Sequence, residues 1–328
     1  MVDEAQITVA NPGEQRTATR CPICGQPLRD SHVRGRDRLI TGDGPFTVME
    51  CVDCEYGFTL PQLSEEELAR YYPSEYFDFW GYSDRPGENP LHRLLERFRS
   101  WSATRSYHRQ PYVLDGVIPG RMLDVGCGSG DLLEHFATRG WEIYGIDPSA
   151  SAVAAAAKRG ATVHQGTLRD QPWQPGSFAL ITFQHALEHI DEPVEALKRA
   201  RALLQPGGLL VIDVPNWACW QRRRLFGSRW HPLELPRHLQ HFSPQALKRL
   251  AGLLGLRVAS VGTTSSVPVT AYSLHYALFG HLRPGWRLWL SYALGILAFP
   301  LVLLGDRVGG GDACFIVMEA SPEQVAQD

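Results

Sequence analysis

Apolar and polar residues follow two different periods along the second half of the chain. Nearly uninterrupted apolar runs, such as residues 178–184 (FALITFQ) and 209–216 (LLVIDVPN), are typical of strands buried on both faces of a sheet. Segments with apolar residues three and four positions apart lie between them, as expected of amphipathic helices. Because strands and helices alternate with short connections, we expect a parallel, doubly wound α/β sheet with helices on both faces. The pattern predicts strands at 121–126, 142–147, 162–166, 178–184, 209–216, 257–262 and 313–320, and helices at 131–140, 151–160, 191–208 and 243–256.

Residues 61–110 precede this alternation and read as helical. Ser64 and Glu67 have the spacing of a capping box, in which each side chain caps the backbone amide of the other at the start of a helix. Residues 91–109 (LHRLLERFRSWSATRSYHR) carry apolar residues at helical spacing. We therefore expect a helical linker or cap ahead of the sheet.

Composition and charge narrow the classes of function. Of the 328 residues, 44% are hydrophobic and 20% are charged, which is ordinary for a globular protein with a sizeable core. The formal net charge of −3 provides no positive field, so we expect no nucleic-acid partner. The first residues, MVDEAQITVANPGEQ, lack the basic end and apolar run of a secretory signal, and we expect a cytoplasmic protein.

Four of the seven cysteines form two CxxC pairs, Cys21–Cys24 and Cys51–Cys54. Two such pairs supply four thiolates for a closed, tetrahedral Zn²⁺ site, and the segment resembles a zinc ribbon with a structural ion. A redox or iron-binding role is the alternative. The predicted division is a disordered lead at 1–20, a zinc ribbon at 21–60, a helical linker or cap at 61–110, a core at 111–265 with 312–320, and an apolar helical insertion at 266–311.

Three glycines at alternate positions, Gly126, Gly128 and Gly130, follow the first strand of the predicted core. The dinucleotide fingerprint GxGxxG needs its third glycine beneath a pyrophosphate, but here Asp131 stands at that position and would repel phosphate. Asp147, at the end of the next strand, can accept hydrogen bonds from both ribose hydroxyls. The pattern indicates a nucleoside without phosphates, although some doubly wound proteins use glycine turns only for packing.

Residues 122–130 (MLDVGCGSG), 144–149 (YGIDPS) and 203–216 (LLQPGGLLVIDVPN) resemble three motifs of class I S-adenosylmethionine (SAM)-dependent methyltransferases. The resemblance covers roughly residues 110–265 and 312–320. It implies a Rossmann-like sheet of seven strands whose last strand is antiparallel. It also implies that SAM is the methyl donor and that S-adenosylhomocysteine is a product.

The same resemblance implies which residues contact SAM. Asp124 would support the turn and the methionine amine, and Thr167 and Leu168 stand where many members carry an acid near the adenine. Gln184 and His185 end the fourth strand, beside the sulfonium. The implied cofactor-binding residues are Asp124, Gly126, Cys127, Gly128, Gly130, Asp147, Pro148, Thr167, Leu168, Gln184 and His185.

Two histidines are candidates for a catalytic base. The sulfonium is already a good leaving group, so a base is needed only where the acceptor must lose a proton. His189 and His238 follow the ends of the fourth and fifth core strands, where open α/β sheets bind ligands, and imidazole suits proton removal near neutral pH. A helix-capping or core hydrogen-bonding role is the alternative for each.

Residues 235–243 (LPRHLQHFS) are similar to the YxEHxSYFS stretch of C-methyltransferases of nucleotide-linked deoxysugars. His238 falls on that family's histidine, but Arg237 stands at its glutamate position and Leu235 at its tyrosine position. Without those partners we expect O-methylation of a lipid-linked, isoprenoid or glycan acceptor in a biosynthetic pathway. C-methylation of nucleotide-linked deoxysugars and a non-catalytic scaffold or binding role are the alternatives.

Two surface features bear on the acceptor. Four arginines lie among aromatic residues at 217–230 (WACWQRRRLFGSRW) and suit an acceptor phosphate or an anionic membrane, with a solvated helix face as the alternative. Residues 288–304 are uncharged and mostly apolar, but the strands before and after them belong to one sheet, which argues against a single membrane crossing. We expect residues 286–304 to contact the inner face of the membrane peripherally, to roof an acceptor pocket or to form a homodimer contact.

Overall fold

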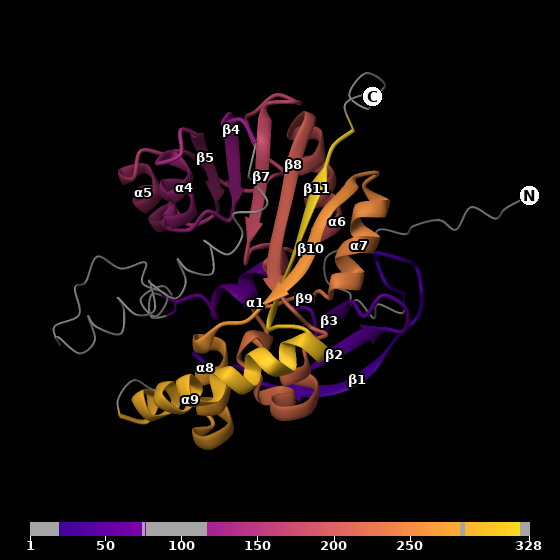
Figure 1. Cartoon of the computed structure of the whole chain (residues 1–328), viewed down its shortest axis with the longest axis vertical. Coiled ribbons are helices and arrows are strands. Elements are labelled where there is room, and N and C mark those ends of the chain that lie inside the picture. Colours follow the sequence, from indigo (N-terminus) through magenta and orange to yellow (C-terminus); the bar gives the residue numbers. More distant parts are fainter. Residues whose placement is uncertain (1–19, 74–75, 77–116, 283–285, 322–328) are drawn as a thin grey trace, which may run out of the picture.

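A computed structural model describes residues 20–73, 76, 117–282 and 286–321 (Figure 1). The lead expected before residue 20 and the helix expected at 91–109 lie outside these residues. Within them, α1 (Glu65–Ala69) begins with the expected capping box, because Ser64 and Glu67 each accept a hydrogen bond from the other's backbone amide.

The centre of the molecule is a seven-stranded sheet with the order β10-β11-β8-β7-β4-β5-β6. The pairs β4–β5, β4–β7, β5–β6 and β7–β8 are parallel, whereas β11 runs antiparallel to both β8 and β10. The prediction of seven strands with the last one antiparallel is therefore confirmed. The strands are β4 Arg121–Val125, β5 Glu142–Asp147, β6 Thr162–Gln165, β7 Phe178–Gln184, β8 Leu204–Pro215, β10 Arg257–Thr264 and β11 Ala313–Glu319.

Helices cover both faces of the sheet, because successive strand residues point to opposite faces. Ile212 of β8 and Ile316 of β11 pack with side chains of α6 and α7 in one buried cluster. Their neighbours Val211 and Val317 pack in a second cluster with side chains of α4 and α5. These helices are α4 Asp131–Ala137, α5 Ala150–Lys158, α6 Pro193–Leu203 and α7 Pro244–Leu253.

The cysteine-containing segment forms a second sheet with the order β1-β2-β3-β9. Its fourth strand, β9, belongs to the segment between β8 and α7, so the ribbon and the core share one sheet. Tyr56 and Phe58 of the ribbon also join the same buried cluster as α6 and α7. The strands are β1 Leu28–Gly35, β2 Phe46–Cys51, β3 Gly57–Leu60 and β9 Gln240–His241.

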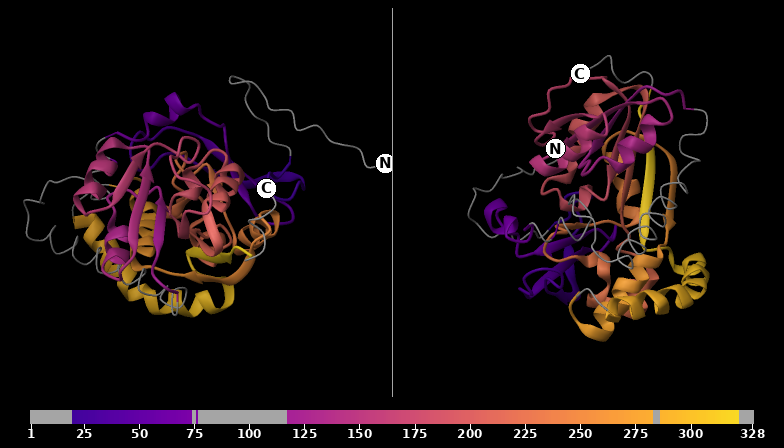
Figure 2. Two further views of the ribbon diagram at one scale, coloured as in Figure 1. Left: turned by 90° about the horizontal axis from the view of Figure 1, so that it is seen from above. Right: turned by 90° about the vertical axis from the view of Figure 1, so that its left-hand side faces the viewer.

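The apolar insertion forms two helices, α8 (Val267–Phe279) and α9 (Trp286–Gly309). Figures 1 and 2 show them beside the ribbon, at the end of the sheet toward which β8 points. By length and composition, Trp286–Arg307 is the single candidate membrane span among the described helices, with a mean hydropathy of 2.0 and only 22% of its most apolar window buried. The helical insertion before the last strand is thus confirmed.

Candidate active site

The glycine turn leads from β4 into α4. Gly126, Gly128 and Gly130 all have positive φ, at 75°, 52° and 83°. A Cβ atom at Gly126 would lie 2.7 Å from the Ala186 side chain, and one at Gly130 would lie 3.0 Å from Ala156. Backbone conformation and close packing therefore both require glycine at these two positions.

Asp147 lies against this turn at the end of β5. Its carboxylate accepts hydrogen bonds from the backbone amides of Gly128 (3.0 Å) and Ser149 (2.9 Å). Burial raises the pKa of Asp147, and the two amides oppose that rise. The neighbouring Pro148 carbonyl accepts a hydrogen bond from Gln165. The acid is thus held in a fixed position beside the glycine backbone, as a ribose-binding role requires.

Asp124 and Cys127 lie buried on either side of the first glycine. The Asp124 carboxylate accepts a hydrogen bond of 2.6 Å from the Thr182 hydroxyl on the adjacent strand. Burial raises the pKa of Asp124 to about 7, partly offset by this hydrogen bond. Burial also raises the pKa of the Cys127 thiol, so this side chain packs as a neutral group.

Thr167 and Leu168 follow β6, at the position where many members of the family carry an acid. Leu168 is buried, and the Thr167 amide and hydroxyl donate to the carboxylate of Asp170 at 2.8 and 3.1 Å. Asp170 therefore brings an acid to this turn from three residues downstream.

Gln184 and His185 end β7 beside β8. Gln184 donates to the Asp213 carboxylate at 3.0 Å, and the His185 amide donates to the Asp213 carbonyl at 2.8 Å. His185 has a positive φ of 50°, and 51% of its side chain is exposed. Desolvation disfavours its imidazolium, but the Glu188 carboxylate at 3.6 Å and the charge of Asp213 outweigh this and raise the pKa of His185 to about 9.

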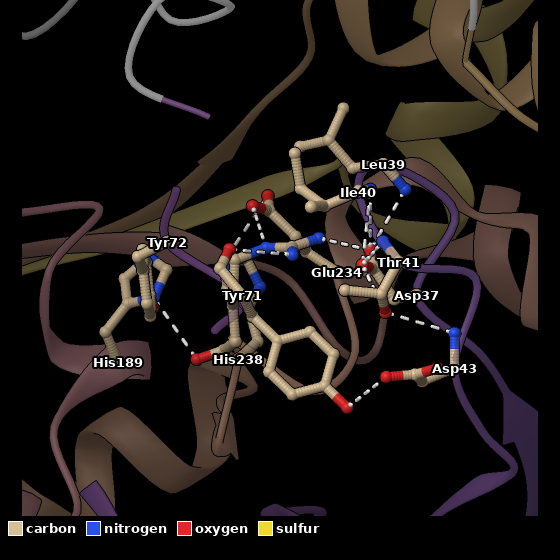
Figure 3. Close-up of polar contacts among 11 residues, drawn as sticks. Asp37, Leu39, Ile40, Thr41, Asp43, Tyr71, Tyr72, His189, Glu234 and His238 are labelled. Carbon is tan, nitrogen blue, oxygen red and sulfur yellow. Dashed lines mark hydrogen bonds and ion pairs between the residues drawn. The ribbon is translucent and has the colours of Figure 1, made fainter. Parts of the chain in front are cut away.

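The two candidate bases, His189 and His238, lie side by side although they come from different segments (Figure 3). Their ring centroids are 4.6 Å apart, with the rings nearly perpendicular. His189 ends a short 3₁₀ turn, Leu187–His189, and its Nδ1 lies 2.9 Å from the Tyr72 hydroxyl. His238 Nδ1 lies 2.8 Å from the carbonyl of Pro232. Burial, reinforced by neighbouring His189 and His241, holds the pKa of His238 well below its usual range, so its ring is neutral.

A carboxylate lies near His238 at a position outside the family's motif. Glu234 Oε2 lies 3.7 Å from His238 Nε2, although Glu234 stands four residues before the histidine and not at the family's glutamate position. Arg237, which occupies that position, is 1% exposed and pairs with Asp37 (2.8 Å) and Glu234 (3.0 Å). The absence of an acid at position 237 therefore does not argue against C-methylation.

The arginine-rich segment was predicted to bind phosphate or an anionic membrane, but two of its arginines have partners within the protein. Arg222 is buried, its guanidinium lies 3.5 Å from the centre of the Trp217 ring, and its Nε donates to the Trp217 carbonyl. Arg223 pairs with Glu55 of the ribbon at 2.7 Å. The prediction was thus wrong for Arg222, which stabilises the fold as a cation stacked on an aromatic ring.

The four cysteine side chains of the ribbon converge. The Sγ–Sγ distances are 3.4 Å for Cys24–Cys51 and 3.6 Å for Cys21–Cys54 and Cys24–Cys54, and all four Sγ atoms lie within 4.8 Å of one another. Tetrahedral Zn²⁺ with bonds of about 2.3 Å places its sulfur ligands about 3.8 Å apart. The donor set and its spacing therefore suit one structural Zn²⁺.

The sheet order, the glycine turn and the acid after β5 define a class I SAM-dependent methyltransferase. The model of the methyltransferase domain family matches residues 80–261, and the chain belongs to this family.

Curated relatives include ubiquinone biosynthesis O-methyltransferases. The protein of Rhodopseudomonas palustris strain BisA53 is 30% identical over 190 residues, which cover 50% of this chain and 75% of the relative. The protein of Bradyrhizobium sp. strain ORS 278 is 33% identical over 136 residues, which cover 39% of this chain and 53% of the relative. The chain thus spans about half the length of some of these relatives.

Solved structures with a similar fold include a SAM-dependent methyltransferase from Archaeoglobus fulgidus. It has a TM-score of 0.48 and 18% identity, and the match covers 70% of this chain and 100% of that chain. Geranyl diphosphate C-methyltransferase from Streptomyces coelicolor has a TM-score of 0.47 and 15% identity, covering 72% and 87%.

Proposed function

We propose that the protein transfers the methyl group of SAM to a hydroxyl oxygen of a lipid-linked, isoprenoid or glycan acceptor in a biosynthetic pathway. The observation that carries this proposal is the His189–His238 pair, two imidazoles in contact near the carboxyl end of β7. A hydroxyl must lose its proton during methylation, and a neutral imidazole can accept that proton. The O-methyltransferase names of the curated relatives support oxygen as the acceptor atom.

The turn geometry supports the proposed cofactor-binding residues. SAM supplies an activated methyl group on its sulfonium. Asp147 would accept from the ribose hydroxyls, Asp124 would face the methionine amine, and Gly126 and Gly128 would admit the nucleoside close to the backbone. Thr167 and Leu168 would lie beside the adenine, and Gln184 with His185 beside the methionine. Zn²⁺ on the four cysteines would have a structural role only, because four thiolates close the coordination sphere.

C-methylation of a nucleotide-linked deoxysugar is the second candidate function. It is favoured by Glu234, whose carboxylate lies 3.7 Å from His238 and can strengthen that imidazole as a base. Removal of a proton from carbon needs such support more than removal from a hydroxyl does.

The apolar helix supports a peripheral membrane location at the cytoplasmic face. Leu297 and Leu301 of α9 are 76% and 69% exposed, and Trp286 at its start is 68% exposed. Exposed arginines, Arg287 and Arg307, stand near its two ends. A helix with this distribution can lie in the interface with its apolar side chains among acyl chains, where a lipid-linked acceptor would be found.

The proposal is tested with methyl-labelled SAM and a lysate of the source organism, extracted into organic and aqueous phases. We expect label in the organic phase, in a product whose new methyl group is an ether. An aqueous product labelled on carbon would instead support the deoxysugar alternative. Label in neither phase, from protein that still binds SAM, would contradict both acceptor proposals.

A matched pair of variants tests the histidine. His238→Ala should keep SAM affinity within about twofold and lower turnover about 10²–10⁴-fold, the usual contribution of a positioned acid or base. His135→Ala, at a partly exposed position of helix α4, is the control and should change neither quantity. Unchanged turnover in His238→Ala would remove this residue from the mechanism.

A further inference from the structure

The side chain of Glu188 stands out among the buried polar groups near β7. Glu188 is 1% exposed, and neither carboxylate oxygen has a hydrogen-bond partner among the described residues. His185 lies 3.6 Å from one oxygen, but half of that imidazole faces solvent. The imidazolium of His185 offsets part of the charge at Oε1, but Oε2 has no hydrogen-bond partner among the described residues, so this buried oxygen can still accept a second cation.

Two imidazoles lie where such a cation would bind. Glu188, His189 and His238 each offer one ligand atom, and these three atoms lie within 4.8 Å of one another. Ligands bound at about 2.0–2.2 Å to one tetrahedral ion lie about 3.4 Å apart, so the three side chains would have to move together by at most about 1.4 Å to bind it. Of the two clusters within the described part of the chain that could hold a metal, this is the one outside the ribbon.

Hydrogen bonds to the two Nδ1 atoms make Nε2 the candidate ligand atom of each ring, and His238 Nε2 has the Glu234 carboxylate 3.7 Å away. His238 Nδ1 lies 2.8 Å from the carbonyl of Pro232, and His189 Nδ1 lies 3.2 Å from the carbonyl of Arg237. A carbonyl can only accept, so His238 Nδ1 carries the proton and its Nε2 carries a lone pair. His189 has the same tautomer when its Nδ1 donates to the Arg237 carbonyl, with the Tyr72 hydroxyl as the second neighbour of that nitrogen. A backbone carbonyl on the far nitrogen is the usual support of a metal-binding histidine.

We propose that Glu188, His189 and His238 bind a divalent transition-metal ion, and that this ion receives the acceptor hydroxyl. Two imidazoles and one carboxylate suit Zn²⁺, Fe²⁺, Mn²⁺ or Co²⁺ better than Mg²⁺ or Ca²⁺, which prefer oxygen ligands. Three protein ligands leave coordination positions open, unlike the closed thiolate site of the ribbon.

The catalytic role of this ion rests on the proposed O-methylation. The hydroxyl would bind to the ion, which lowers the pKa of a bound hydroxyl, and its proton would leave to water. The resulting oxygen attacks the methyl carbon, the S–CH₃ bond breaks, and its electron pair stays on sulfur to give S-adenosylhomocysteine. The two histidines would thus promote proton loss through the ion.

The test is a Mn²⁺ titration of the full-length, zinc-loaded protein, followed by electron paramagnetic resonance of free Mn²⁺. Mn²⁺ is a poor match for four thiolates, so it reports the second site without displacing ribbon zinc. We expect about one Mn²⁺ per chain, displaced by Zn²⁺ in slight excess. Glu188→Gln and His238→Gln should each weaken Mn²⁺ binding at least tenfold. Glu192→Gln, an exposed carboxylate paired with Arg169, is the matched control and should bind Mn²⁺ as the wild type does.

The outcomes separate the metal site from the proposed function. Wild-type protein that binds SAM but no Mn²⁺, Zn²⁺ or Fe²⁺ outside the ribbon would overturn the site. Mn²⁺ affinity that is unchanged in folded Glu188→Gln would overturn it as well. Mn²⁺ binding that depends on Glu188, with methyl transfer insensitive to its removal, would keep the site and refute its role in activating the acceptor. Mn²⁺ binding without any O-methylated product would refute the proposed function alone.

Discussion

The ion pair between Asp37 and Arg237 ties the ribbon to the segment that carries His238, and its removal should be costly. Arg237 Nη2 lies 2.8 Å from Asp37 Oδ1, and the two side chains are 1% and 0% exposed. Asp37 also accepts hydrogen bonds from the backbone amides of residues 39–41, which form the loop after β1 (Figure 3). We consider the change Asp37→Ala, which removes every one of these contacts at once.

The expected loss follows from what remains buried. Without Asp37, the Arg237 guanidinium keeps only Glu234 as a charged partner, and the loop amides lose their acceptor. Breaking a buried pair by removing one partner typically costs about 3–5 kcal/mol, because the other charge stays desolvated. We therefore expect the free energy of unfolding to fall by about that amount, and methyl transfer to fall with it as His238 loses its support.

Equilibrium unfolding in urea, followed by tryptophan fluorescence, measures this loss. The control is Glu195→Ala, which removes an exposed pair with Lys198 (53% and 54% exposed) and should cost less than about 1 kcal/mol. A loss below about 1 kcal/mol for Asp37→Ala as well would refute the reasoning, since it would mean that the loop and Arg237 find other partners.

The same pair predicts a pH dependence of stability. Burial alone would raise the pKa of Asp37, but the Arg237 guanidinium and the loop amides outweigh it, so the pKa in the folded protein lies below its unfolded value. The contribution of Asp37 is then fully present above about pH 4 and is lost as the pH falls below that. The difference in unfolding free energy between wild type and Asp37→Ala should therefore shrink below pH 4, and a constant difference down to pH 2 would contradict this sign.

Three further results are expected. If Asp124 binds the methionine amine as proposed, SAM affinity measured by calorimetry should weaken about tenfold from pH 8 to pH 6, because burial raises the pKa of Asp124 to about 7 and only its charged form balances the amine. Equal affinity at both pH values would contradict this proposal. Cys51→Ser should lower the zinc retained against a weak chelator and the melting temperature together, whereas full retention would remove this thiolate from the site. Replacing both Leu297 and Leu301 with Glu should reduce binding to anionic vesicles more than tenfold while leaving unfolding unchanged, since both side chains are exposed; undiminished binding, or loss of a dimer instead, would refute the membrane contact.

The sheet and the glycine turn could be predicted from sequence because their determinants are local. A continuous apolar run such as residues 178–184 is typical of a strand that is buried on both faces of a sheet. Few residues other than glycine adopt the positive φ found at Gly126 and Gly130. The convergence of four cysteines also followed from spacing alone, since two CxxC turns are rarely placed together without a shared ion.

The partners of the two histidines could not be predicted, because they come from distant or out-of-register positions. Tyr72, which lies 2.9 Å from His189, is 117 residues away in the chain. Glu234 reaches His238 only because the chain turns between them, with Glu234 itself at a φ of 35°. Arg222 looked like surface charge, and only the packing of Trp217 against it revealed a buried cation. These contacts arise from the tertiary structure, so they cannot be identified by comparing aligned positions of the sequence.

The ribbon's place in the fold suggests a role for the proposed zinc ion in positioning His238, the proposed acceptor-side residue. β3 pairs with β9, Thr59 donates to the carbonyl of His238 at 2.7 Å, and Ser243 donates to the carbonyl of Cys54 at 2.9 Å. These bonds hold both ends of the short segment between His238 and α7. The glycine turn makes none of these contacts, and its amides at residues 126–128 donate to Ile146 and Asp147 of β5. Loss of zinc should therefore displace His238 while leaving the SAM-binding turn in place, so that the ribbon governs where the acceptor is activated and the sheet governs where the methyl donor sits.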